Sequence, residues 1–552
     1  ADDGPMPQTR EHLDILTLLD VRHGVVVLTK IDRVSAEELR VVRQVVAEFL
    51  RGTFLADAPI VHVSNVTGDG LGELYEVLTR LVGSIRPKPV DGVFRMPVER
   101  AFSIKGHGTV IAGVPIAGSA RVDDEIVLLP DGLAGRIKSI QVYGQASETV
   151  LAGQCAAINV RHWDHRVVER GKTVTVPGFC ETHGWCVGQL RLLPAERLFL
   201  KHGSTVKFHT GTSEHLARVY LLAGEGLHGG AKAFAQFRLE EPIVTGPRDR
   251  FIVRDPSPPR TIGGGIILEA MPRRLNRNQP GLLDLLQRQL AAMAEDVSLV
   301  EFCAATTDST LIEPAAVARR GLVPLGRTAA IMEDLAAAGT LVRAPDRTYL
   351  HRVAAERIEL ELLDRLTAFH RDSPESPGVL MDELRQTWDV PPAALQAVVD
   401  RLRSAGRIAV ADQRLALADH RPAIGEADAD PLARVEALFQ TRRFNPPDTA
   451  EIAAALALAP EAVQRLVRIL IEHRRLVRID RDFVFHGDAV RQAREKIVTH
   501  IHQHGRLESV DFKYTLDTTR KYALPLLDYF DRTGLTKRSS DNTRLLRNPE
   551  GP

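Results

Sequence analysis

The sequence predicts a multidomain protein in which an α/β domain is followed by two β-barrels and then by four tandem winged-helix domains. The chain has 552 residues, far more than one hydrophobic core can organise. Near its start, apolar runs of strand length alternate with helical patterns, as in a parallel α/β sheet. In its last half, a helix followed by two short β runs occurs four times. Between these regions, short β runs broken by glycine are typical of antiparallel barrels.

The expected domain boundaries follow from these changes in pattern. We expect an incomplete α/β domain over 1–84, barrels over 85–178 and 179–272, and winged helices over 273–351, 352–420, 430–487 and 488–548. A polar segment at residues 420–430 (HRPAIGEADAD) divides the second pair of winged helices from the first.

Composition is typical of a folded soluble protein, because 44% of residues are hydrophobic and 26% are charged. The sequence contains no apolar span of 18 residues and no basic leader followed by a hydrophobic stretch, so we expect a cytoplasmic protein with no membrane partner. Four cysteines cannot form a disulfide framework. Residues 180–186 (CETHGWC) could suggest zinc, but their spacing fits no common zinc motif, so we favour buried or loop cysteines and expect no metal site.

The net charge of zero hides four blocks of alternating sign. Residues 1–83 carry a net charge of −5, 84–278 carry +8, 279–430 carry −8 and 431–552 carry +5. Two positive blocks separated by a negative one suggest two distinct polyanion contacts with a spacer between them. Solvated faces without a ligand are the alternative.

The front of the chain has the pattern of a parallel sheet. Residues 25–32 read VVVLTKID, an apolar strand that ends on a lysine and an aspartate. Ser35 and Glu38 have the spacing of a capping box, and apolar residues at helical spacing follow. Residues 60–64 (IVHVS) are a second buried strand, followed by a polar loop and a helix over about 71–83. This order of strand, helix, strand and helix predicts parallel α/β structure.

Polar residues follow both strands where ligands bind in such sheets, beyond the carboxyl ends. They are Thr29, Lys30, Asp32, Ser64 and Asn65. A carboxylate there can accept two parallel hydrogen bonds from the N–H and amino group of guanine, and a lysine stem can lie over the ring. The segment TKID resembles the N/TKxD guanine-specificity motif of translational GTPases, and VSNVTG resembles their following loop. The resemblance implies a P-loop GTPase-type domain in which these residues bind GTP or GDP, with Mg²⁺ in the complete protein.

Part of that nucleotide site is not found in this chain. Residues 1–12 resemble the segment that follows the second switch of such GTPases. The nearest match to G-x4-G-K-[ST] is GKT at 171–173, but Arg166 stands where the first glycine should be and no helix pattern follows, so we interpret it as a barrel turn. The family's catalytic histidine would lie in the missing N-terminal segment, so we assign no catalytic residue and give His12 no such role. We therefore expect this chain not to bind GTP tightly, nor to hydrolyse it alone.

The middle region has the sequence pattern of two β-barrels. Residues 102–113 (FSIKGHGTVIAG) read as a strand, a glycine turn and a strand. The glycines could suggest a dinucleotide site, but no helix opens after them. The segments RFIVRD at 250–255 and TIGGG at 261–265 resemble the end strands of the third domain of translational GTPases. That resemblance implies that this basic pair of barrels holds aminoacyl-tRNA, mainly through its phosphate backbone.

The tail repeats one unit. The pattern around Leu341, Ile408, Leu476 and Leu535 returns at spacings of 67, 68 and 59 residues. Each copy is an amphipathic helix, a short turn and two β runs, which is the length and order of a winged helix. The acidic front pair would repel phosphate, whereas the basic back pair would attract it.

The last unit concentrates cations around its expected recognition helix, which opens with TTRKYALP at 518–525. We select as RNA-binding residues Lys513, Arg520, Lys521, Tyr522, Lys537, Arg538 and Arg544. Cations beside a tyrosine suit an RNA hairpin whose loop base can flip out and stack. A charged, solvated helix end is the alternative.

This combination of modules, with TTRKYALPLL in the last, resembles the bacterial selenocysteine-specific elongation factors over essentially the whole chain. The resemblance implies a monomeric factor that uses GTP, delivers selenocysteinyl-tRNA to the ribosome at UGA codons and binds an mRNA hairpin through its terminal winged helices. Holding both RNAs on one chain would raise the factor's effective concentration at the right codon.

The amino-acid pocket of such a factor should be cationic. A selenol is largely ionised at neutral pH, so a cation would favour it over serine. Arg218 is our candidate, and a simple barrel-surface cation is the alternative. Where the family often has an arginine, this sequence has Cys155.

Two other function classes explain only part of the chain. A general translation factor would share residues 1–270 but would have no need of a basic terminal winged helix. A DNA-binding regulator would share the winged helices but would leave TKID and the barrels without purpose. Binding of an RNA stem-loop by residues 431–552, with much weaker binding of duplex DNA, would distinguish our hypothesis from both.

Overall fold

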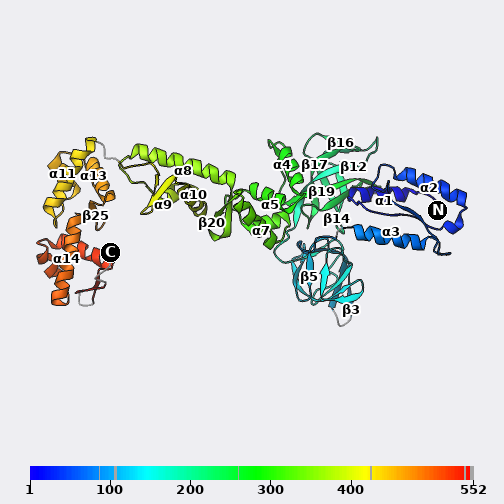
Figure 1. Ribbon diagram of the computed structural model, residues 1–552, viewed down its shortest axis with the longest axis horizontal. Helices are drawn as coiled ribbons and strands as arrows, with labels where there is room; N and C mark the ends of the chain where they lie inside the picture. Colours follow the sequence, from blue (N-terminus) through cyan, green and yellow to red (C-terminus); the bar gives the residue numbers. More distant parts are fainter. Residues whose placement is uncertain (86, 105–107, 259, 423–425, 540–542, 548–552) are drawn as a thin grey trace. The chain divides into compact units, whose positions relative to one another are not determined.

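The computed structural model describes residues 1–85, 87–104, 108–258, 260–422, 426–539 and 543–547. The chain separates into two compact units, Ala1–Arg343 with Arg347–His351 and Ala344–Asp346 with Arg352–Pro552. The first unit contains an α/β domain, two barrels and one winged helix, and the second contains three further winged helices (Figure 1). Within the described residues, no helix is both long enough and apolar enough to span a bilayer.

The N-terminal domain consists of two short parallel strands with helices around them. Its elements are α1 (Pro7–Leu18), β1 (Val26–Leu28), the 3₁₀ turn η1 (Ile31–Arg33), α2 (Ala36–Leu50), β2 (Ile60–His62) and α3 (Leu71–Ser84). β1 pairs in parallel with β2, with Val27 opposite Val61. The capping box forms as expected, because the Ser35 hydroxyl accepts from the Glu38 N–H while the Ser35 N–H donates to the Glu38 carboxylate. The predicted parallel α/β order is confirmed.

The first barrel is an antiparallel sheet closed on itself. Its strands are β3 (Arg95–Ile104), β4 (Gly108–Gly113), β5 (Ser119–Arg121), β6 (Glu125–Leu129), β7 (Leu133–Val142), β8 (Gln145–Ser147), β9 (Thr149–Leu151), β10 (Ala156–Val160) and β11 (Thr173–Thr175). The main sheet has the order β10-β4-β3-β11-β6-β7-β8, and a further pairing of β10 with β7 closes it. The segment GKT at 171–173 is the turn into β11, as predicted, and Lys172 donates to the carbonyl of Val167 at 2.7 Å. The predicted glycine turn after residue 104 falls partly on residues 105–107, outside the described residues.

The second barrel has six strands in the closed order β12-β17-β15-β14-β18-β19. They are β12 (His183–Leu192), β14 (Thr205–Thr210), β15 (Ser213–Leu221), β17 (Lys232–Ile243), β18 (Arg250–Arg254) and β19 (Thr261–Met271), and a side pair consists of β13 (Phe199–Lys201) and β16 (Gly226–His228). Three phenylalanines, Phe208, Phe237 and Phe251, fill its interior with ring centroids 5.0 Å apart. The two barrels are joined by an ion pair in which Arg95 donates twice to Asp249, at 2.7 and 2.9 Å.

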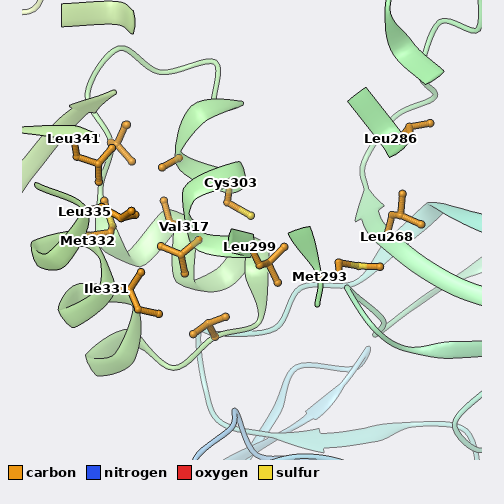
Figure 2. Packing of buried hydrophobic residues seen from close by; sticks show 14 of the residues in the cluster. Leu268, Leu286, Met293, Leu299, Cys303, Val317, Ile331, Met332, Leu335 and Leu341 are labelled. Atoms are coloured by element: carbon orange, nitrogen blue, oxygen red, sulfur yellow. The ribbon is translucent and has the colours of Figure 1, made fainter. Parts of the chain in front are cut away.

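The first winged helix shares its hydrophobic core with the second barrel. It is built from α4 (Leu282–Ala292), α5 (Asp296–Ala305), α6 (Pro314–Gly321), α7 (Leu325–Ala337), β20 (Leu341–Ala344) and β21 (Thr348–His351). Leu268 of β19 packs in one buried cluster with Leu286 of α4 and with Met293 and Leu299 (Figure 2). Arg320 of α6 also donates to the carboxylate of Glu269 at 2.8 Å. The boundary expected between residues 272 and 273 therefore crosses one continuous core.

Three units of three helices and a β-hairpin make up the rest of the chain. The second winged helix comprises α8 (Arg352–Asp372), β22 (Val379–Leu380), α9 (Met381–Thr387), α10 (Pro392–Ser404), β23 (Ile408–Ala411) and β24 (Arg414–Leu417). The third comprises α11 (Glu426–Arg442), α12 (Thr449–Leu456), α13 (Pro460–Glu472), β25 (Leu476–Arg478) and β26 (Val484–His486). The fourth comprises α14 (Gly487–His504), α15 (Ser509–Thr515), α16 (Arg520–Arg532), β27 (Thr536–Arg538) and β28 (Arg544–Leu546). The predicted fold class is confirmed.

The last two winged helices share a core as well. Phe444 and Phe485 of the third unit belong to the same buried cluster as Phe512 and Leu527 of the fourth. The Thr518 hydroxyl donates to the carbonyl of Phe444 at 2.7 Å across this junction. The polar segment expected over 420–430 is shorter than predicted, because α11 already begins at Glu426, and residues 423–425 lie outside the described residues.

Candidate functional site

The two polar loops at the carboxyl ends of β1 and β2 are joined by one hydrogen bond. The Ser64 hydroxyl donates to Asp32 Oδ1 at 2.6 Å. That hydroxyl also accepts from the backbone N–H groups of Val66 and Thr67, each at 3.2 Å. Ser64 is buried while Asp32 is exposed. The serine therefore orients a carboxylate that remains open to a ligand.

Backbone conformation brings the two loops together. Lys30 has a left-handed φ of 58°, which turns the chain from β1 into η1 and places Asp32 opposite Ser64. At the end of the second loop, Gly70 has a φ of 73°, and a Cβ there would lie 1.8 Å from the carbonyl oxygen of His62. Only glycine fits at this position, since any side chain would collide with β2.

The arrangement can bind the edge of a purine. A carboxylate offers about four acceptor positions, and Ser64 occupies one of those on Asp32. The others can accept the ring N–H and amino group of guanine together. Thr29, Lys30 and Asn65 are exposed beside it, so the lysine stem is available to cover the ring. The five residues predicted for this site are thus brought together by two short loops.

The structure places Arg218 on the exposed face of a barrel strand. It is exposed on β15, where it pairs in register with Thr205 of β14 and Arg238 of β17. Arg238 is exposed too, and neither guanidinium has an ion-pair partner among the described residues. Arg218 is therefore half of an arginine pair on the barrel surface, and its role in a selenol pocket stays a prediction.

The cysteines have different environments. Cys186 lies in the core of the second barrel, where burial raises the pKa of its thiol and no zinc ion could reach it. Cys180 lies with its sulfur 3.4 Å from the Thr175 hydroxyl. In the described part of the chain, no group of three or more His, Cys, Asp or Glu side chains is arranged to hold a metal ion. Cys155 is exposed.

Most of the selected cations of the fourth winged helix are on its surface. Arg520 and Lys521 are exposed at the start of α16, and Lys537 and Arg538 are exposed on the wing strand β27. Lys513 of α15 is half-buried. These five side chains remain candidates for contacts with phosphate.

Arg544 must be removed from this set, because its side chain is only 1% exposed. It donates to Asp531 at 2.9 Å, to Asp528 at 3.0 Å and to the Ser509 hydroxyl at 2.9 Å. A buried guanidinium whose donors are already paired with carboxylates cannot bind a phosphate. Arg544 instead ties the wing to α15 and α16.

Tyr522 is also corrected. It is half-buried, and its ring packs edge-on against Phe483 and Phe485 of the third winged helix, with centroids 5.6 and 6.4 Å away. The Tyr522 ring is packed between the third and fourth winged helices, so it is not free to stack on a base. Another tyrosine of the same winged helix, Tyr514, is 71% exposed and was not selected from the sequence. It directly follows the selected Lys513.

Comparison with known proteins agrees with this domain order. The chain matches four protein families: elongation factor Tu GTP binding domain over residues 1–84, selenocysteine-specific elongation factor beta-barrel domain over 189–274, and elongation factor SelB winged helix over 363–417 and again over 499–545. It is 30% identical to the selenocysteine-specific elongation factor of Desulfomicrobium baculatum over 549 residues, which covers 99% of this chain and 86% of that protein. The chain belongs to the selenocysteine-specific elongation factor family.

Other members of the family support the same assignment. The selenocysteine-specific elongation factor of Escherichia coli (strain K12) is 26% identical, over 99% of this chain and 85% of that protein. A crystal structure of a bacterial selenocysteine-specific elongation factor has the same fold, with a TM-score of 0.63 at 21% identity over 99% of this chain and 85% of that one. The first 84 residues of this elongation factor thus belong to a GTPase domain of the elongation factor Tu type.

Proposed function

We propose that this elongation factor delivers selenocysteinyl-tRNA to the ribosome at UGA codons, uses GTP in doing so, and is recruited by an mRNA hairpin. It would act in the cytoplasm as a single chain. The observation that carries the proposal is that one chain joins the Asp32–Ser64 base site to a surface-exposed basic winged helix. A general tRNA carrier has no use for the second feature, and a DNA-binding regulator has no use for the first.

The base site would act by selecting guanine. Ser64 holds Asp32 in place, and the carboxylate accepts from the guanine edge. No segment of residues 1–552 has the G-x4-G-K-[ST] pattern, so we assign the base of the nucleotide and not its phosphates or Mg²⁺.

Asp32→Asn tests this assignment. Asparagine places an amide donor or a single carbonyl where guanine needs a doubly accepting carboxylate, so one charge-assisted hydrogen bond is lost. We expect the ratio of GDP to XDP affinity to fall by about 10- to 150-fold, from a loss of about 1.5–3 kcal/mol. An NMR titration with each nucleotide measures it even at millimolar affinity, and the ratio cancels all phosphate contacts. Asp69→Asn is the matched control, because the Asp69 carboxylate lies in the adjacent loop and bonds only to the Thr67 hydroxyl and not to Asp32. An unchanged ratio in Asp32→Asn would refute the base assignment.

The barrels would hold the tRNA. Arg218 and Arg238 face each other directly across two strands, which is unfavourable for the free protein because like charges repel. Phosphates of an RNA backbone would relieve that repulsion. We propose this role for the pair beside the predicted role of Arg218 in the selenol pocket.

The hairpin contact can be tested on the full chain. A library of RNA stem-loops with randomised loop and bulge positions is selected for binding to the protein, with duplex DNA present as competitor. We expect enrichment of stem-loops with defined unpaired bases. With about five phosphate-binding cations, affinity should fall about 10²-fold between 50 and 200 mM salt. If duplex DNA competed as well as the stem-loops bind, a DNA-binding regulator would be favoured. If no stem-loop were enriched, a general tRNA carrier would be favoured.

A further inference from the structure

Helix α15 of the fourth winged helix has an unpartnered aromatic face. Its inner side is formed by Phe512 and Leu516, which are 0% and 2% exposed. Its outer side carries Val510 and Tyr514, which are 59% and 71% exposed. Residues four positions apart lie on one helical face, so the valine and the tyrosine form one apolar surface.

The tyrosine ring is held beside a cation. Lys513 Nζ lies 4.5 Å from the centroid of the Tyr514 ring. Among the described residues, no second ring or cation contacts Tyr514. The ring is therefore large, polarised by one ammonium group and otherwise open to solvent.

A hydrogen-bonded turn connects α15 to the start of α16. The Asp517 N–H donates to the carbonyl of Tyr514 at 3.2 Å, and the Thr518 N–H donates to the carbonyl of Lys513 at 3.1 Å. Two residues later the chain reaches Arg520. The Thr518 hydroxyl anchors this turn to the third winged helix through the Phe444 carbonyl. The helix that carries the ring thus ends in a fixed turn, and exposed Arg520 and Lys521 follow at the start of α16.

An open aromatic ring in contact with one lysine, in a winged helix that carries further exposed cations, has the chemistry of a base-stacking platform. Aromatic side chains stack on unpaired bases, while neighbouring cations bind the flanking phosphates. Exposed Asp511 and Asp517 lie three residues on either side of Tyr514, but Lys513 contacts the ring and residues 431–552 carry a net charge of +5. The charge therefore favours RNA as the occupant.

We infer that Tyr514 stacks on one unpaired base of the bound RNA hairpin and so contributes to the choice of hairpin. This inference rests on the proposed hairpin binding. It replaces Tyr522, whose ring is packed between two winged helices, with a tyrosine whose ring is free.

The test uses the full chain and the stem-loop selected from the randomised library. Tyr514→Leu removes the ring and keeps an apolar side chain, so we expect about 10-fold weaker binding of that stem-loop. Tyr514→Phe keeps the ring and should bind as the unmodified chain does. Replacing each unpaired nucleotide in turn with an abasic one should reveal one position at which Tyr514→Leu has no further effect.

Tyr75→Leu is the matched control, because Tyr75 is 74% exposed on α3 and should not alter hairpin binding. If a stem-loop is selected but Tyr514→Leu binds it as tightly as the unmodified chain, the inference is wrong and the proposed function stands. If Tyr514→Leu weakens every abasic stem-loop equally, the tyrosine contacts something other than a base and the inference is also wrong. If no stem-loop is selected at all, it is the proposed function that fails.

Discussion

Replacing Asp249 with alanine is expected to destabilise the pair of barrels by about 3–5 kcal/mol, because it leaves a buried arginine without its counter-charge. The side chains of Arg95 and Asp249 are only 8% and 13% exposed. Asp249 Oδ2 also accepts from the Gly246 N–H at 2.9 Å and the Thr245 hydroxyl at 3.1 Å. The substitution therefore removes the acceptor of both guanidinium hydrogen bonds from Arg95 and of the hydrogen bonds from Thr245 and Gly246.

Differential scanning calorimetry of the full chain measures the effect. We expect the transition that contains the barrels to shift down by about 10 °C or more. Glu125→Ala is the matched control: its ion pair with Arg136 is just as short, at 2.7 Å, but its partners are 67% and 59% exposed. An exposed pair contributes about 0–1 kcal/mol, so this variant should unfold almost as the unmodified chain does. Equal shifts in the two variants would show that burial is not the cause.

Arg544→Met is expected to destabilise the fourth winged helix by about 3–5 kcal/mol, for the same physical reason in another place. The Arg544 guanidinium joins Asp531 and Asp528 of α16 to Ser509 of α15. The backbone of Arg544 pairs with that of Leu507. Asp531 is 20% exposed, so the substitution leaves a largely buried carboxylate facing a thioether. The wing should then separate from the helices before the rest of the chain unfolds.

Hydrogen exchange followed by mass spectrometry locates the change. Amides of α15, α16 and β28 should lose protection in Arg544→Met, while those of the barrels should not. Arg491→Met is the control, because Arg491 makes an ion pair at 3.0 Å with Asp488 in the same winged helix but is 71% exposed. If Arg544→Met kept full protection and yet bound RNA stem-loops more weakly, Arg544 would be an RNA ligand after all.

Local signals predicted the elements well. The helix expected over about 71–83 is α3 (Leu71–Ser84), and the apolar strand expected directly before TKID is β1 (Val26–Leu28). Capping and apolar spacing act over one or two turns of chain, so the printed residues carry them completely. The four repeats were visible for the same reason. The meeting of the two polar loops was predictable because each of them directly follows a strand.

The availability of individual side chains was not predictable. Arg544, Arg520 and Lys537 look alike in the sequence, since each is a cation near an expected turn or wing. Of these three cations, only Arg544 donates hydrogen bonds to two carboxylates of α16, those of Asp531 and Asp528. Tyr522 and Tyr514 both stand beside lysines, but the rings that cover Tyr522 belong to residues 483 and 485 of another unit.

The sequence by itself determined the order of modules, the two loops that meet at Asp32 and the placement of the basic blocks, because these depend on periodicity, motif spacing and charge within short stretches. Only the tertiary structure decided which cations face solvent, which tyrosine is free, and that the second barrel and the first winged helix share one core. Each of those outcomes depends on burial, and burial is set by segments that are distant along the chain and adjacent only after folding.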